Sequence, residues 1–150
     1  MDILVVPGPE PSYRPSPEVV TFLQKSITTV SALLVICSGI LPVAFSGILD
    51  GRTVTAPRTM IPFLEKKIPG ATWVDLRWAK DVKERQRGKP LEVWTSGGVT
   101  NGTDMIAAYV KEKYPPALAT FVCAGADVGD RPKEYGAPPP HFEMSAFNGN

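Results

Sequence analysis

Cys37 is the residue whose type and setting best suit chemistry. It lies between two apolar runs: residues 32–36, rich in branched side chains, and the run that follows Gly39. A buried strand, a sharp turn and a buried helix in this order form a nucleophile elbow, which holds a nucleophile on a strained turn. The helix end favours thiolate over thiol, and backbone N–H groups at the turn stabilise an oxyanion. The stretch therefore predicts a nucleophilic cysteine at position 37.

Two other interpretations of this stretch stay open at the level of sequence. Buried cysteines are common in protein cores, so Cys37 could end a strand without doing chemistry. Residues 26–49 carry no charge, and a membrane span takes roughly 20 apolar residues. Gly39, Pro42 and Gly47 interrupt this run, and neither flank is clearly more basic than the other, so a buried strand and helix are favoured over a span.

Composition and charge narrow the classes of protein and partner. The chain has 150 residues, 43% hydrophobic and 21% charged, with a net charge of +1. These values predict a globular domain and do not indicate a nucleic-acid or membrane partner. Cys37 and Cys123 are far apart, without metal-ligand spacing, and the chain shows no signal peptide, so we expect reduced thiols and a cytoplasmic protein. We expect neither a metal nor a cofactor.

Only one histidine, His141, is present, and it lies in a proline-rich tail. A peptidase or amidotransferase mechanism needs a Cys-His pair, for which this residue is the sole and poorly placed donor. A zinc site built from His and Cys is disfavoured for the same reason. The sequence therefore favours cysteine chemistry that does not depend on histidine.

Alternating strand and helix patterns predict an α/β layered fold with a parallel core. Residues 2–8 form an apolar run expected to be a central strand buried on both faces. The expected strands and helices are, in order, strand 2–6, helix 18–27, strand 32–37, a helix after Gly39, strand 53–55, helix 60–67, strand 71–78, strand 91–95, helix 103–113 and helix 117–126. Residues 80–89 carry dense charges of mixed sign and are expected to form a solvated excursion.

Several candidate residues follow strands at their carboxyl ends, where open α/β sheets bind ligands. Gly8, Cys37 and residues 95–97 all stand at such positions. A glycine there allows backbone to approach a ligand closely. Residues 96–102 are glycine-rich and precede a helix, which could cradle an anion. They lack Walker A or dinucleotide-motif spacing, so nucleotide binding is not indicated.

An ordered set of motifs carries a family resemblance. The set spans residues 2–114 and consists of residues 2–8, 35–39, 44–52, 77–78 and 93–104. In order and spacing these motifs resemble the ThiJ/PfpI family, and within it the isonitrile hydratase-like branch. The resemblance implies a flavodoxin-like fold of the class I glutamine amidotransferase type with a mostly parallel sheet, in residues 1–126, followed by a Gly/Pro-rich tail in residues 127–150.

The resemblance also implies roles for individual residues. Cys37 would be the nucleophile, Gly8 and Ser38 would lend backbone N–H groups, and Gly39 would belong to the pocket. In an isonitrile hydratase the thiolate attacks the terminal carbon of the small-molecule substrate, and water releases an N-substituted formamide. Other branches use the cysteine on 2-oxoaldehydes or as an oxidation sensor. Members are usually homodimers.

This chain departs from the family pattern at three places. The family's first strand-helix-strand section, which carries an acid beside the cysteine, is missing, and Glu10 is the nearest local carboxylate that could substitute for it. Pro57 and Arg58 stand where the branch often has His-Trp or Asn-Lys. Residues 80–92 look like a charged insertion. These departures keep open a degenerate member that binds or senses without catalysis.

Overall fold

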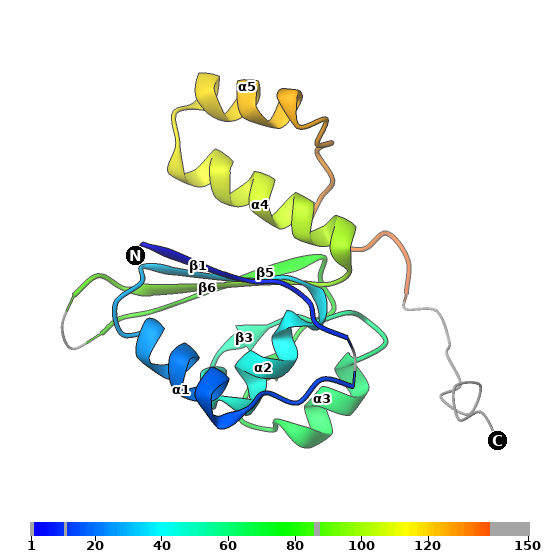
Figure 1. The fold of residues 1–150 in the computed structure, drawn as a ribbon. Helices are drawn as coiled ribbons and strands as arrows, with labels where there is room; N and C mark the ends of the chain where they lie inside the picture. The colour runs from blue at the N-terminus through cyan, green and yellow to red at the C-terminus, as the bar shows by residue number, and fades with distance from the viewer. Residues whose placement is uncertain (1, 11, 86–87, 139–150) are drawn as a thin grey trace.

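The computed structural model describes residues 2–10, 12–85 and 88–138. His141 and the rest of residues 139–150 lie outside the described residues. A four-stranded sheet in the order β1-β2-β6-β5 forms the centre of the fold (Figure 1). Its strands are β1 (Ile3–Val6), β2 (Ala32–Val35), β6 (Leu91–Ser96) and β5 (Trp78–Lys83). β1, β2 and β6 are parallel, and β5 is antiparallel to β6. The predicted mixed α/β architecture with a mostly parallel sheet is confirmed.

Helices cover the sheet on its two faces (Figure 1). One face packs against α1 (Pro17–Ser26), α2 (Ile40–Phe45), α3 (Ile61–Lys67) and the small parallel pair β3 (Thr53–Val54) and β4 (Thr72–Trp73). The other face packs against α4 (Val99–Lys113), and α5 (Pro116–Gly125) lies on α4, away from the sheet. Side chains alternate along a strand, so Leu33 and Val35 enter one core and Leu34 enters the other.

The uncharged stretch of residues 26–49 folds as a strand and a short buried helix. All four residues of β2 are buried. A 3₁₀ turn, η1 (Cys37–Gly39), joins β2 to α2, in which five of six residues are buried. Among the described residues, no helix is long and apolar enough to cross a membrane. The apolar run of β2 corresponds to burial of the strand on both faces of the sheet.

β1 is an edge strand, which corrects the prediction of a central strand. It pairs only with β2 in the sheet, and Val5 is 47% exposed. An apolar run is buried only where other elements of the protein cover it. In the described residues no strand pairs with the second edge of β1, so that edge is open. The edge and its exposed valine are surfaces that proteins commonly protect.

The charged stretch is the second correction. Its first part is strand β5, which pairs with β6 along six residues from Trp78 to Lys83. Inside it, Lys80 forms ion pairs with Glu92 and Glu112, and Asp81 pairs with Arg52. Charges that find partners nearby do not prevent strand pairing, so residues 80–83 of the predicted excursion are part of a strand. Of the expected strand 71–78, residues 72–73 form β4, and Trp78 is the first residue of β5.

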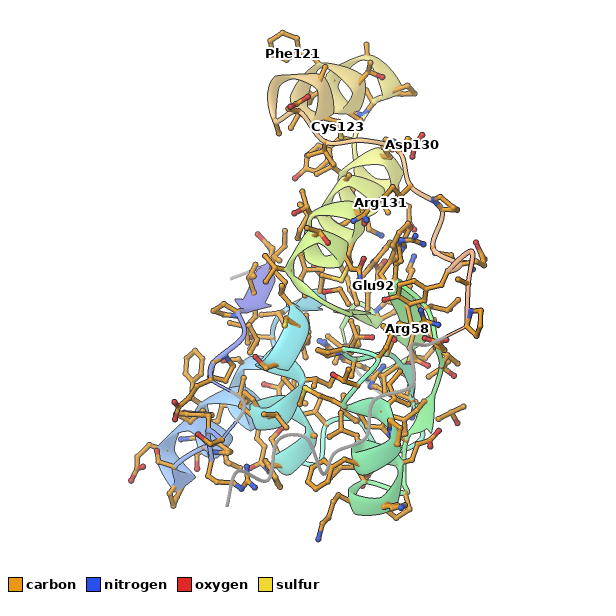
Figure 2. All side chains as sticks on the ribbon, turned by 90° about the vertical axis from the view of Figure 1, so that its right-hand side faces the viewer. Arg58, Glu92, Phe121, Cys123, Asp130 and Arg131 are labelled. Carbon is orange, nitrogen blue, oxygen red and sulfur yellow. The ribbon has the colours of Figure 1, made fainter. Side chains whose placement is uncertain are left out.

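The two C-terminal helices agree in part with the predicted helices 103–113 and 117–126. α4 begins at Val99, four residues earlier than expected, and so takes in the end of the glycine-rich run. α5 buries Cys123, which is 8% exposed, whereas Phe121 on its outer surface is 75% exposed (Figure 2). α5 therefore uses one narrow face for packing and leaves the rest of its apolar surface open.

Candidate functional site

Cys37 occupies a strained turn directly after β2. Its φ is +56°, a left-handed conformation that among the described non-glycine residues only Asp127 shares. A non-glycine residue in this region costs about 1–3 kcal/mol and is held there by its surroundings. Ile36 is still extended, and its N–H donates to the carbonyl of Val6 at 3.0 Å. The side chain of Cys37 is half-buried, and this backbone arrangement is that of a nucleophile elbow.

The loop after β1 packs against the elbow through Gly8. A Cβ at Gly8 would lie 2.6 Å from Ser38 Oγ, 3.2 Å from Ser38 N and 3.4 Å from Cys37 Cβ. The hydroxyl of Ser38 is buried and donates a hydrogen bond to the carbonyl of Pro9. The structure thus brings together Gly8, Cys37 and Ser38, three residues that the sequence predicted for one site.

Gly39 fixes the approach of β1 to the start of α2. A Cβ there would meet the carbonyl oxygens of Val6 and Pro7, the latter at 2.9 Å. No side chain fits at such a distance from backbone, so glycine is required by contact rather than by φ. Gly39 is therefore the residue of the turn that packs against the backbone after β1.

Helix α4 supports the elbow from the other side, which sequence reasoning missed. A Cβ at Gly102 would lie 2.6 Å from Cγ2 of Ile36, so the helix lies against the residue before Cys37. Ser96, at the end of β6, donates through Oγ to the carbonyl of Val35 at 3.3 Å. A glycine inside an otherwise helical pattern is the signal that could have identified this contact.

Glu10 is not brought to the thiol by any described contact. Its side chain is exposed, and Oε1 accepts a hydrogen bond from Ser12 Oγ at 2.9 Å. Its carbonyl accepts from the N–H of Tyr13 at 3.0 Å, which closes a local turn. The role of Glu10 as a substitute acid stays a prediction without a geometric argument in its favour.

A polar cluster that the sequence did not predict surrounds Tyr135. Its phenol oxygen accepts a hydrogen bond from Asn101 Nδ2 at 2.7 Å, and the guanidinium groups of Arg58 and Arg77 lie 4.0 and 4.8 Å from its ring centroid. Arg58 also forms a two-pronged ion pair with Asp75 at 2.8 and 2.7 Å, which raises the pKa of Arg58. Arg58, the second residue of the pair that replaces the branch's His-Trp or Asn-Lys, is thus held in place by Asp75 and by the ring of Tyr135.

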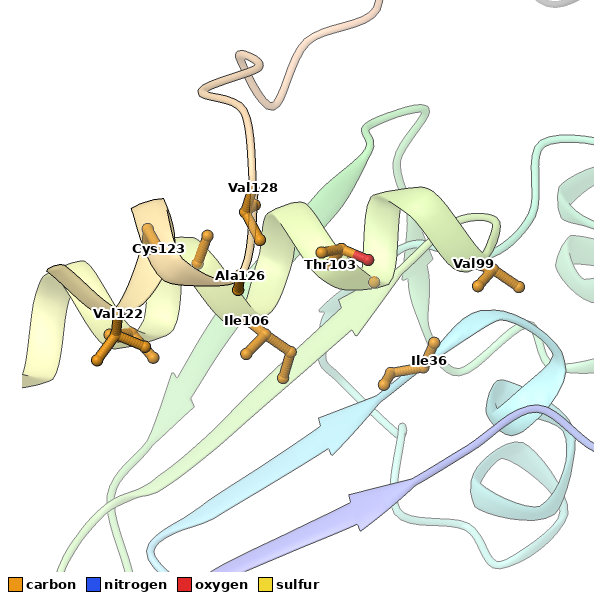
Figure 3. Close-up of a pocket in the computed structure, with 11 residues that line it drawn as sticks. Ile36, Val99, Thr103, Ile106, Val122, Cys123, Ala126 and Val128 are labelled. Atoms are coloured by element: carbon orange, nitrogen blue, oxygen red, sulfur yellow. The ribbon is translucent and has the colours of Figure 1, made fainter. Parts of the chain in front are cut away.

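An apolar groove lies between α4, α5 and the end of β2 (Figure 3). It has a volume of about 340 Å³, and Ile36, Ile106, Val122 and Cys123 are among its lining residues. The side chain of Ile36 lines the groove, and the next residue in the chain is Cys37. The groove and the turn at Cys37 are therefore adjacent. Thr103 is the hydroxyl-bearing side chain in a lining that is otherwise almost entirely apolar.

Metal chemistry finds no support in the side chains that the structure describes. Within residues 2–10, 12–85 and 88–138, no group of three or more His, Cys, Asp or Glu side chains could hold a metal ion. The reactive groups gathered at the elbow are the thiol, the Ser38 hydroxyl and backbone amides. Such a set suits covalent catalysis or thiol-based sensing.

Comparison with known proteins shows the fold. No protein-family model and no curated protein matches the chain. Solved structures do match, with 17% identity and a TM-score of 0.63 to an AraC family transcriptional regulator from Pseudomonas putida, covering 84% of this chain and 63% of that one. A THiJ/PfpI family protein from Pseudomonas syringae matches with 21% identity and a TM-score of 0.55, covering 84% of this chain and 45% of that one.

Drosophila melanogaster DJ-1beta also matches, with 20% identity and a TM-score of 0.58, covering 85% of this chain and 64% of that one. The chain spans less than two thirds of the length of each of these three structures. At these identities the likeness concerns architecture alone. The chain has the flavodoxin-like α/β fold that the ThiJ/PfpI and DJ-1 proteins share.

Proposed function

We propose that the chain is a cysteine-dependent hydratase of the ThiJ/PfpI type that converts an isonitrile into an N-substituted formamide. The observation that carries the proposal is the positive φ of Cys37 with Gly8 packed against the same turn. A strained turn of this kind is retained where it positions a reactive side chain. Gly8, Ser38 and Gly39 are assigned to the backbone and pocket of the site.

The proposed reaction uses the thiol as a covalent catalyst. The thiolate of Cys37 forms a bond to the terminal carbon of the isonitrile, and that carbon takes a proton from an acid, which gives a thioimidate. Water adds across the C=N bond, its oxygen to the carbon and one proton to the nitrogen. The C–S bond then breaks, and the proton of the added hydroxyl returns to the acid. The sum is isonitrile plus water to formamide.

A 2-oxoaldehyde is the second substrate class for the same thiol, since an aldehyde carbon is also a small electrophile. A role in binding or redox sensing without turnover is the other alternative. Two observations favour it: the carboxylate of Glu10 is engaged by Ser12, and one structural neighbour is a transcriptional regulator. Sensing would require only an accessible thiol, and Cys37 is half-buried rather than enclosed.

Assembly, location and chain organisation belong to the proposal as well. Homodimerisation would cover exposed apolar groups such as Val5 on edge strand β1. We propose a cytoplasmic protein that acts on a small molecule and needs no cofactor. We also propose residues 1–126 as the α/β unit and residues 127–150 as its tail.

The test is turnover of an alkyl isonitrile, followed as N-formamide, with methylglyoxal consumption measured in parallel. Cys37→Ser should abolish activity, and the matched variant Cys123→Ser, in a buried cysteine of the α4–α5 groove, should retain it. Activity on methylglyoxal but not on the isonitrile would show that the substrate is a 2-oxoaldehyde. Equal activity of parent and Cys37→Ser on the two substrates would overturn the proposal, and an inactive parent whose Cys37 is oxidised by peroxide would favour sensing.

A further inference from the structure

A segment after α5 returns to the main body of the protein and is fastened there. We call residues 131–137 the C-terminal strap; Figure 2 shows the chain running from Asp130 and Arg131 toward Arg58. Arg131 at its start pairs with Asp104 of α4 at 3.2 and 2.6 Å. Near its end, Arg58 donates to the carbonyl of Ala137 at 2.9 Å. The strap is therefore anchored at its two ends to different elements of the core.

Arg77 holds the middle of the strap. Its backbone N–H donates to the carbonyl of Lys133 at 2.7 Å. Its guanidinium donates to the carbonyl oxygens of Pro132 at 3.3 Å and Glu134 at 2.6 Å. Three consecutive carbonyl groups are thus fixed by one residue, which also stacks on the ring of Tyr135. This arrangement sets the position of Tyr135 closely.

Tyr135 places its hydroxyl at the carboxyl end of β6, the strand that pairs with β2. The oxygen lies 2.9 Å from the position that a Cβ on Gly97 would take. Val35 of β2 pairs with Thr95 of β6, so Cys37 and Gly97 each follow this pair by two residues. Neighbouring strands lie about 4.8 Å apart, and the rim that carries Cys37 is therefore also the rim that receives the Tyr135 hydroxyl.

The hydrogen bonding of Tyr135 leaves its proton for another acceptor. Asn101 Nδ2 donates to the phenol oxygen at 2.7 Å, which uses a lone pair and not the O–H proton. Burial raises the pKa of Tyr135 and Asp75 adds to the rise; together they outweigh the charges of Arg58 and Arg77 and the hydrogen bond from Asn101, which lower it. The phenol is thus neutral, and able to donate, throughout the physiological range of pH.

We infer that the Tyr135 hydroxyl is the proton donor of the Cys37 site. This inference rests on the proposed function and supplies the acid that its chemistry needs. When the C–S bond forms, the phenol proton moves to the isonitrile carbon and leaves a phenolate beside the guanidinium groups of Arg58 and Arg77. The hydroxyl proton of the water adduct restores the phenol when the C–S bond breaks, so the proton returns to its source in each cycle.

The test compares Tyr135→Phe with Tyr114→Phe, which removes the same hydroxyl from an exposed position at the end of α4. Kinetics on an alkyl isonitrile, the melting temperature and the rate of Cys37 alkylation by iodoacetamide are measured for each. Loss of a general acid costs about 10²–10⁴-fold, so Tyr135→Phe should lower kcat by at least about 100-fold. Its alkylation rate should stay near that of the parent, because ring stacking is kept, whereas its melting temperature should fall somewhat, because buried Asn101 loses its acceptor.

The outcomes separate this inference from the proposed function. A parent that is active and dependent on Cys37, with Tyr135→Phe within twofold of its kcat, would overturn the role of Tyr135 alone. A fall in kcat accompanied by an equal fall in the alkylation rate would show that the hydroxyl supports the thiol's structure, which also overturns proton donation. A parent without turnover would overturn the proposed function and this inference together.

Discussion

Gly8 and Ser38 are so close that a methyl group on Gly8 would stand 2.6 Å from Ser38 Oγ. The loop after β1 and the turn after β2 are therefore fitted to each other at the point where the proposed nucleophile sits. Contacts of this kind tolerate no added volume without movement of one partner. The geometry of the thiol depends on a residue that is itself exposed and far away in sequence.

Gly8→Ala should lower kcat/KM for the isonitrile at least about tenfold, because displacement of catalytic groups by even about 1 Å costs large factors in rate. The melting temperature should fall as well, because the added methyl meets the buried Ser38 and overpacking costs about 1–3 kcal/mol. Gly129→Ala is the matched control, as a Cβ there meets nothing within 4 Å. Parent-like kinetics for Gly8→Ala would show that the loop does not constrain the site.

The ion pair between Arg52 and Asp81 should be the most costly one to break. Their side chains are 8% and 15% exposed, with Nη1 and Oδ1 2.7 Å apart, and Asp81 also accepts from the N–H of Thr53. Asp81→Ala leaves a buried guanidinium without its partner, which typically costs about 3–5 kcal/mol. Urea unfolding measures the loss.

Asp130→Ala provides the comparison for that prediction. Asp130 pairs with Lys111 at 3.0 Å, but its side chain is 89% exposed. Exposed pairs contribute at most about 1 kcal/mol, so this variant should be close to the parent. Equal losses in Asp81→Ala and Asp130→Ala would contradict the assignment of Asp81 to a buried, structural pair.

Gly102→Ala should destabilise the protein despite lying within a helix. Alanine in place of glycine usually stabilises a helix by about 1 kcal/mol. Here the added methyl would stand 2.6 Å from Cγ2 of Ile36, a stiff β-branched side chain. Overpacking costs about 1–3 kcal/mol, so we expect a net loss that Ile36→Ala in the same protein reduces. A more stable Gly102→Ala would show that Ile36 can move aside.

Stability should decline in acid through Glu112. Its hydrogen bond from Lys80 lowers its pKa below the ordinary value of 4.5, and Lys113 adds to this effect. A carboxyl group whose pKa is lower in the folded than in the unfolded protein stabilises the fold at pH values above its unfolded-state pKa. This stabilisation is lost as the pH falls through its folded-state pKa. In Glu112→Gln the melting temperature should therefore fall less steeply with decreasing pH below about pH 4.5. The effect is small, since the side chain is 41% exposed. An unchanged acid slope would contradict this.

Much of the scaffold could be predicted from the sequence, because its signals are local. The apolar runs of β1 and β2, the break at Cys37 and the helix after it depend on residues adjacent in the chain. Gly8 and Cys37 both follow parallel strands, so the topology of the sheet brings their loops to one rim. The meeting of these two residues could therefore be expected before any coordinates.

The remaining features depend on partners distant in sequence. The charges of residues 80 and 81 are compatible with a strand because they pair with Glu92 of β6, Glu112 of α4 and Arg52 just before β3. The edge position of β1 depends on which other strands pair with it, and an apolar run does not contain that information. Tyr135 could not be placed because its segment has no periodic pattern. Its position comes from the hydrogen bond that Arg77 donates to the carbonyl of neighbouring Glu134 and from the one that Asn101 donates to the phenol oxygen.

The most direct test of the central claim is the alkylation of the native protein by iodoacetamide, with the two cysteines resolved by mass spectrometry. A strained, half-exposed elbow predicts that Cys37 is modified at least about tenfold faster than free cysteine at the same pH. The buried Cys123 should react only after unfolding. Modification of Cys37 no faster than free cysteine, or only together with Cys123 in denaturant, would contradict a nucleophilic role for Cys37.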